Sequence, residues 1–586
     1  MAEEIDKKAP PPVDDEVGHV SLREEQRDAA IAVPIEEEAV QDAYHVRLSW
    51  RVMAQVFVVV AAGSVIAFIA RDLGDAPLAG WVIQGPLLMQ SVLSPIVGRL
   101  SDVTDRKLLA VAPPLVATAG AVMSATARSM AVLIGGGVLI GATLSTISIL
   151  HAITPEILPL KYRTLASGFN FMGGAVGGLI GSLGAGAVTN TSSGGWRYIF
   201  WIQAIFHALT AIGIFCFYWP PKRRTTAGYA SMSLGQYVWA CDPVGCVLFI
   251  GSATLVLLSL DWAGGAYAWG DPHVAAPLAL GLALLVLFAL YEWKGRSDGL
   301  VAHVFFHRNA NFAYSVFAFA VEGWIFYSAV NSVVPQIVLN LGFETDAWSI
   351  AVRQLSYQLP VLAVSVPVTW YATRYKDPKT PLLVTFTVFL AVCISYAALQ
   401  PSWDVAQIVL NVLSGIGQSG PLTLLVACVQ FTAPHAFLST ATGLAFSARA
   451  IGGAFGSAVL NAIINGRLSA HLAPAVGAAA VSAGLPEAAV PALLEALEAG
   501  TLFETGGGSV PGALTLTLTP EVLAAAAEAS RDEYAHAYRL AWASVIPFVV
   551  LAVAAVALLK GVRDLMTEKV EATVERVSEK KTTAEV

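Results

Sequence analysis

The stretch Gly98-Arg99-Leu100-Ser101-Asp102-Val103-Thr104-Asp105-Arg106-Lys107 joins two long apolar runs, at about residues 79–97 and 108–125. A run of roughly 20 apolar residues can cross the hydrocarbon core of a bilayer as a helix. The helix is forced there, because every backbone polar group must find its partner within its own segment. A short charged loop between two such runs therefore predicts a turn at the membrane surface.

The same pattern repeats along the rest of the chain. Of its 586 residues, 56% are hydrophobic and only 13% are charged, whereas an ordinary soluble domain carries about 25% charged residues. The formal net charge of −8 argues against a nucleic-acid partner, which would require a basic face. We therefore expect an all-α polytopic membrane protein with about fourteen transmembrane helices. The apolar runs are 52–70, 79–97, 108–125, 130–150, 165–188, 197–219, 242–260, 274–291, 310–338, 348–369, 381–399, 404–430, 441–465 and 538–559.

Polar stretches divide the chain into five parts. We expect a disordered acidic tail at residues 1–46, a six-helix bundle at 47–219 and a linker region with two extra transmembrane helices at 220–309. A second six-helix bundle at 310–560 includes a long extracellular loop at 466–537, and a C-terminal tail follows at 561–586. Lysine and arginine gather in alternate loops, which by the positive-inside rule places both termini in the cytosol.

Motifs for enzyme chemistry are missing from this sequence. It has no His-Glu-x-x-His, no Gly-x-Ser-x-Gly and no phosphate-cradling Gly-x-x-x-x-Gly-Lys. Its five cysteines lie in or beside apolar runs and are interpreted as small apolar side chains rather than metal ligands. We expect no catalytic residues, no metal and no cofactor.

An ionisable side chain inside a membrane span is costly and by default serves a function. Glu322 is the leading candidate for proton coupling, and Arg353 and Arg449 are its possible partners. Two alternatives remain open at this point. Glu322 could belong to a structural salt bridge, and Arg449 could serve packing or gating.

Polar and aromatic side chains within the spans could line a central pocket. An apolar cavity with a few convergent polar groups suits an amphiphilic organic solute. For any one of these residues, ordinary core packing is the alternative. The candidates are Phe169, Asn170, Trp324, Tyr327, Asn331, Gln336, Gln354, Tyr357 and Gln358.

The quoted loop resembles the signature of the major facilitator superfamily, Gly-x-Leu-x-Asp-x-x-Gly-Arg-Arg/Lys. Gly98, Leu100, Asp102, Arg106 and Lys107 match it, and an aspartate replaces the second glycine. The resemblance implies two six-helix bundles that rock around a central site. The loop would then act as a gate at the cytosolic face, with its carboxylate against a helix N-terminus.

The run at 165–188 is rich in glycine. Gly173, Gly177 and Gly181 are four residues apart, which permits close contact between helices in lipid. The run also resembles the antiporter motif of drug exporters, which Gly177, Gly181 and Gly186 match. Ordinary helix packing is the alternative reading of these glycines.

Over about residues 50–570 the chain resembles fungal fourteen-helix facilitators of the trichothecene efflux pump group, which is close to the siderophore-iron transporters. The supporting segments are 196–200, 217–221 and 429–430. The resemblance implies export of a toxin, drug or secondary metabolite, driven by protons. We expect a monomer in the plasma membrane, with a vacuolar or vesicle membrane as the alternative. The alternatives are a siderophore-iron/proton symporter, a membrane-embedded enzyme and a transporter-like receptor.

Overall fold

The computed structural model describes residues 69, 72–73, 81–104, 106–189, 194–217, 233–263, 267–307, 309–498 and 519–567. Within these ranges every extended regular element is a helix, and eleven helices are long and apolar enough to cross a membrane. This confirms the all-α polytopic fold. The tail at 1–46, nearly all of the run at 52–70 and residues 568–586 lie outside the described residues, so the count of fourteen spans stays a prediction.

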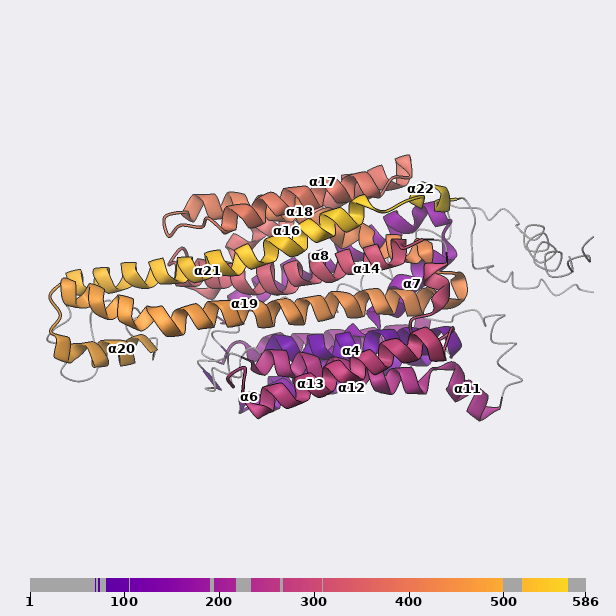
Figure 1. Ribbon diagram of the computed structural model, residues 1–586, viewed down its shortest axis with the longest axis horizontal. Helices are drawn as coiled ribbons and strands as arrows, with labels where there is room; N and C mark the ends of the chain where they lie inside the picture. The colour runs from indigo at the N-terminus through magenta and orange to yellow at the C-terminus, as the bar shows by residue number, and fades with distance from the viewer. Residues whose placement is uncertain are drawn as a thin grey trace, which may run out of the picture. The chain divides into compact units, whose positions relative to one another are not determined.

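The first half and the linker follow the expected order of apolar runs (Figure 1). The helices of the first half are α4 (Trp81–Val103), α5 (Arg106–Ala125), α6 (Met130–Leu144), α7 (Ile147–Ile157), α8 (Arg163–Thr189) and α9 (Arg197–Phe217). The helices of the linker are α11 (Leu234–Ala240), α12 (Pro243–Trp262) and α13 (Pro272–Leu290).

The second half contains the longest helices of the described chain. They are α14 (Asn311–Gly323), η5 (Trp324–Val333), α15 (Val334–Asn340), α16 (Ala347–Tyr375), α17 (Lys379–Tyr396), α18 (Asp404–Thr432), α19 (Leu438–Ser482), α20 (Val490–Glu498), α21 (Pro520–Ala557) and α22 (Val562–Leu565). Helices α14, η5 and α15 form one continuous span, in which η5 is a π-helical segment. Such widened turns are frequently found at functional sites.

Local sequence signals explain where several helices begin. Asp346 caps α16 by accepting hydrogen bonds from the backbone N–H groups of Trp348 and Ser349, both at 3.0 Å. Proline occupies the first turn of α12, α13 and α21, where its fixed φ suits a helix and its missing N–H has no intrahelical acceptor.

Helices α19 and α21 are much longer than the runs at 441–465 and 538–559 predicted. They contain 45 and 38 residues, or roughly 68 and 57 Å at 1.5 Å per residue, against a hydrocarbon core of about 30 Å. Where the structure describes it, the segment expected as a loop is therefore largely helical, because alanine-rich sequence favours a helix in water as well. Arg467 of α19 pairs with Glu533 of α21 at 2.9 Å, and α20 lies beside their far ends (Figure 1).

Two seams join the halves, and both begin at the same end of the bundle. Helix α4 packs along α19, and α8 packs along α16. A Cβ at Gly98 would overlap the carbonyl oxygen of Ser439, and one at Gly443 would overlap that of Ser94. Neither α4 nor α16 is among the eleven strongly apolar spans, because both carry polar side chains, and Gln90 of α4 and Arg353 of α16 are buried.

Candidate functional site

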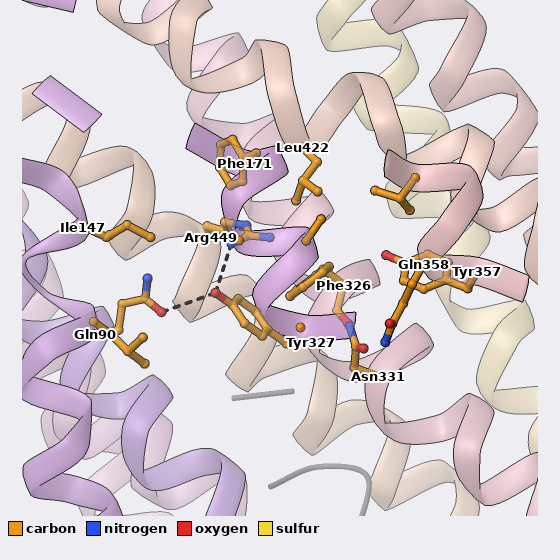
Figure 2. A pocket seen from close by; sticks show the side chains of 15 residues that line it. Gln90, Ile147, Phe171, Phe326, Tyr327, Asn331, Tyr357, Gln358, Leu422 and Arg449 are labelled. Atoms are coloured by element: carbon orange, nitrogen blue, oxygen red, sulfur yellow. Dashed lines mark hydrogen bonds between the residues drawn. The ribbon is translucent and has the colours of Figure 1, made fainter. Parts of the chain in front are cut away.

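A central pocket opens between the halves, and both contribute to its lining (Figure 2). Helices α4, α6, α7 and α8 form one side, and η5, α16, α18 and α19 form the other. The walls combine aromatic and aliphatic groups with a few amides and hydroxyls. The lining residues are Gln90, Leu144, Ile147, Phe171, Gly174, Ala175, Gly178, Phe326, Tyr327, Asn331, Tyr357, Gln358, Val361, Leu422 and Arg449.

A buried ion pair lies at the edge of this pocket. Arg449 Nη2 donates to Glu322 Oε1 at 3.0 Å, and Arg449 Nε donates to Oε2 at 2.5 Å. Glu322 is fully buried and Arg449 is 4% exposed. The structure therefore brings together two of the three residues predicted for proton coupling. Removing one partner of such a pair costs about 3–5 kcal/mol, because an unpaired charge is left in a medium of low polarity.

Hydrogen bonds extend from the ion pair across the pocket. On one side Arg449 Nη1 donates to the hydroxyl oxygen of Tyr327 at 3.0 Å, and that hydroxyl donates to Gln90 at 3.4 Å (Figure 2). On the other side Tyr357 donates to Gln418 Oε1 at 2.6 Å, and Gln418 Nε2 donates to Glu322 at 3.4 Å. A change of protonation at Glu322 therefore acts on groups from both halves.

Aromatic rings surround the Arg449 guanidinium. Its central carbon lies 4.7 Å from the Phe326 ring centre, 4.9 Å from Tyr327, 5.3 Å from Phe319 and 5.7 Å from Phe171. A cation over an aromatic face is stabilised by about 0.5–2 kcal/mol. The rings thus help to hold the charge while limiting its contact with water.

The structure places the signature loop of the sequence at the α4–α19 seam. Asp102 is 7% exposed and accepts hydrogen bonds from the α19 N-terminus. The donors are the backbone N–H of Ser439 at 3.3 Å, that of Thr440 at 2.8 Å and the Thr440 hydroxyl at 2.7 Å. Negative charge is favoured at this end of a helix, where N–H groups lack intrahelical acceptors.

The remaining loop residues have different surroundings. Leu100 is half-buried on α4, and Lys107 Nζ lies 5.1 Å from the Phe215 ring centre. The side chain of Arg106 and all of Asp105 lie outside the described residues. Arg99, which the signature does not specify, is 4% exposed and donates to the carbonyl oxygen of Ala240 at 3.0 Å.

Arg99 connects the signature loop to the linker. Its Nη2 lies 3.8 Å from Asp298, which also accepts from Arg296 Nε at 2.9 Å. Burial opposes ionisation of Asp298, but hydrogen bonding to Arg296 and the positive charges of Arg296 and Arg99 keep its pKa below the usual range. Asp242 anchors the same region by accepting from the backbone N–H of Leu300 at 3.0 Å.

The α8–α16 seam carries the glycine-rich run. Gly173, Gly177, Gly181 and Gly186 are buried, but the pocket is lined by the neighbouring Gly174 and Gly178. A Cβ at Gly186 would lie 2.9 Å from the carbonyl oxygen of Ala347. Close packing against α16 therefore accounts for the last glycine of the motif.

Some predicted pocket residues line the pocket and others do not. Tyr327, Asn331, Tyr357 and Gln358 line it. The others are absent from the lining. Three of them have other surroundings: Phe169 is 41% exposed, Trp324 packs against Phe455 and Phe548, and Gln336 bonds to Ser332. The predicted residues outside the lining are Phe169, Asn170, Trp324, Gln336 and Gln354.

Arg353 lies in a separate network, away from Glu322. Its guanidinium donates to Glu344 at 3.2 Å, to the Asp404 carboxylate at 2.6 Å and to Gln407 at 2.7 Å. These contacts tie the start of α16 to the start of α18. The structure thus gives Arg353 an anchoring position and makes Arg449 the partner of Glu322.

Sequence reasoning missed Gln90, Gln418 and Phe171. The two glutamines carried the signal that singled out Glu322, because a polar side chain in the middle of an apolar run needs a partner inside the bundle. Phe171 carried no such signal, since its neighbour Phe169 has the same side chain and only the rotation of α8 distinguishes them. Among the described residues, no group of three or more His, Cys, Asp or Glu side chains could hold a metal.

Residues 52–457 match the family described as Major Facilitator Superfamily. The trichothecene efflux pump of Fusarium sporotrichioides is 24% identical over 513 residues, which cover 86% of this chain and 83% of that protein. An MFS-type transporter of an Acremonium species is 25% identical over 411 residues, with 69% and 67% covered. A solved structure described as "Structural insights into substrate recognition in proton dependent oligopeptide transporters" has a TM-score of 0.50 and 13% identity, with 89% and 99% covered. At that identity the likeness shows the fold alone.

Proposed function

The chain belongs to the major facilitator superfamily, and from this premise we propose that it exports a small organic solute by alternating access, coupled to protons. Membership makes it a membrane transporter rather than an enzyme. The curated relatives described above include one named as a trichothecene efflux pump, which supports export of a toxin, drug or secondary metabolite. We place it as a monomer in a fungal plasma membrane, with both termini in the cytosol.

The composition of the pocket carries the proposal for the solute. Rings from both halves face it, and they are accompanied by the amides of Gln90, Asn331 and Gln358. The one charged lining residue among those described, Arg449, is neutralised by Glu322. Such walls favour a ligand that is largely apolar, carries several oxygen atoms and has no net charge.

The two seams support alternating access. Bonds from the Asp102 carboxylate hold α4 to α19, and Thr164 of α8 bonds Thr373 of α16 at 2.8 Å at the same end. Opening this end requires those bonds to break while the pocket residues stay within their own halves. Rocking of two bundles around a fixed site meets that requirement.

The ion pair supports proton coupling. Protonation of Glu322 would remove its charge and leave the Arg449 guanidinium unpaired beside the pocket. The associated cost of about 3–5 kcal/mol is enough to shift a conformational equilibrium by roughly two to four orders of magnitude. A proton on Glu322 would therefore favour a different arrangement of α14 and α19, the helices that carry the pair.

Export profiling of a deletion strain against a metabolite panel tests the solute proposal. We expect the strain to retain at least one oxygenated, uncharged metabolite that the parent strain exports, and re-expression of the gene to restore export. Iron-dependent accumulation of a labelled siderophore in a siderophore-deficient yeast would instead establish uptake and refute the export proposal.

Proteoliposomes loaded with the retained metabolite test the coupling. In Glu322→Gln we expect pH-gradient-driven flux to disappear while exchange of solute at equal pH persists. Arg353→Lys serves as the matched control, because it changes a buried charged residue outside the pocket. Unchanged pH-driven flux in Glu322→Gln would remove this carboxyl from the mechanism.

A further inference from the structure

A buried histidine on α7 has no hydrogen-bond partner for its side chain among the described residues. His151 is fully buried, and neither Nδ1 nor Nε2 is bonded. A neutral imidazole has one donor and one acceptor nitrogen, and leaving a buried polar group unsatisfied costs about 1–3 kcal/mol. A histidine that only filled space would be disfavoured at this position relative to a phenylalanine.

The position of His151 relates it to the ion pair. Ile147, one helical turn earlier on α7, lines the pocket. The imidazole centre lies 4.9 Å from the Phe171 ring and 5.0 Å from the Phe446 ring, and Phe171 also contacts the Arg449 guanidinium. His151 therefore lies directly behind the aromatic layer that bounds the charged end of the pocket.

Further polar groups continue from His151 toward the Asp102 end. Gln430 Nε2 donates to the His151 carbonyl oxygen at 2.9 Å and to Thr442 at 3.2 Å. The Gln430 Oε1 atom is buried without a partner, as is the hydroxyl of Ser167, one turn before Phe171 on α8. Buried polar atoms of this kind are ordinarily satisfied by internal water.

We propose that His151 relays protons between Glu322 and the Asp102 end of the transporter. A proton leaves the Glu322 carboxyl, bonds to one ring nitrogen of His151 through intervening water, and the N–H on the other nitrogen gives its proton to water beside Gln430. This second transfer leaves the imidazole neutral but in the other tautomer, and reorientation of the ring or exchange of the tautomers restores the starting state. The inference rests on the proton coupling proposed above.

The charges around His151 set the order of the steps. Helices α4, α8 and α19 pack against α7, and α18 bonds to it through Gln430. Arg449 of α19 acts electrostatically on the imidazole. Asp102 of α4 accepts a hydrogen bond from Thr440, and Arg163 of α8 donates to the Gln430 carbonyl oxygen. Helix α18 contributes Gln430, which is uncharged. While Glu322 carries the proton, Arg449 is unpaired and repels an imidazolium. Transfer to His151 restores the ion pair and so favours onward movement of the proton.

Time-resolved infrared spectroscopy of oriented proteoliposomes tests the relay without a solute. The carboxyl band of Glu322 is assigned by its loss in Glu322→Gln, and its protonation is followed after an acid jump on the Asp102 side. We expect His151→Phe and His151→Gln to slow this protonation at least tenfold. Added imidazole should restore the rate in His151→Ala. His207→Phe is the matched control, because His207 is equally buried and unpartnered but lies on α9, which contributes no residue to the pocket lining.

The possible results separate the relay from the coupling proposal. If wild-type protein shows no Glu322 band that responds to pH, proton coupling through Glu322 fails and the relay fails with it. If the band responds at the wild-type rate in folded His151→Phe and His151→Gln, the relay alone is overturned. Should one variant misfold, the other and the imidazole rescue still decide the result.

Discussion

Replacing Asp102 by asparagine should open the Asp102 end of the bundle. The carboxylate accepts three hydrogen bonds from Ser439 and Thr440 at the α19 N-terminus. Asparagine keeps the shape but has no charge, and its amide group presents donors to the donors of α19. A hydrogen bond to a charged group stabilises by about 1.5–3 kcal/mol, against about 0.5–1.5 kcal/mol for a neutral one. The favourable interaction of a partly buried charge with the helix terminus, up to about 2 kcal/mol, is also lost.

We take about 2 kcal/mol as the net loss, which corresponds to a shift of roughly 30-fold toward the open state at 1.36 kcal/mol per tenfold change. Spin labels at Leu108 and Ala436, in a background without native cysteines, would report the distance across the seam. We expect a new long-distance population in Asp102→Asn. Thr440→Val, which removes one donor, should give a smaller shift by itself and little further change in the double variant.

An unchanged distance distribution in folded Asp102→Asn would refute the reasoning. The closed end would then be held by packing at Gly98 and Gly443 rather than by the carboxylate. A shift of equal size in Asp102→Glu would also contradict it, because glutamate retains the charge and the capacity to accept from the helix N-terminus.

Gly452→Ala should lower thermal stability in detergent by about 1–3 kcal/mol, because its Cβ would overlap the carbonyl oxygen of Ala320. Gly466→Ala on the same helix has open space and should be neutral or stabilising by up to about 1 kcal/mol; equal melting temperatures for the two variants would contradict the packing argument. Arg353→Lys should lower the melting temperature by weakening the contacts between α16 and α18, with pH-driven flux retained, and loss of that flux would assign Arg353 to coupling. Burial raises the pKa of the Cys241 thiol, so its alkylation by iodoacetamide, in a variant without other cysteines, should increase with pH to a midpoint above the ~8.5 of free cysteine. A midpoint at or below that value would show that burial does not dominate the pKa of this thiol, which the charges of Arg99 and Arg296 lower.

The apolar runs of the sequence were enough to predict that lipid surrounds most of the chain and that the chain is helical there. Runs of apolar residues near 20 in length require helices in lipid, and the described chain contains such helices. The same reasoning singled out the signature loop and Glu322, since charged groups are rare in lipid. The apolar runs did not predict the alanine-rich continuations of α19 and α21. These continuations are helical, but they are not apolar enough to look like membrane spans.

Tertiary structure decided which side chains meet. In a soluble helix one apolar face points inward, so the period of the sequence reveals the buried side. In a membrane both lipid and core are apolar, and the pattern does not distinguish Phe169, which is exposed, from Phe171, which lines the pocket. The pairing of Glu322 with Arg449 rather than Arg353 likewise depends on the contact between α14 and α19. Those contacts join residues more than a hundred positions apart, and only the packing of the helices brings them within bonding distance.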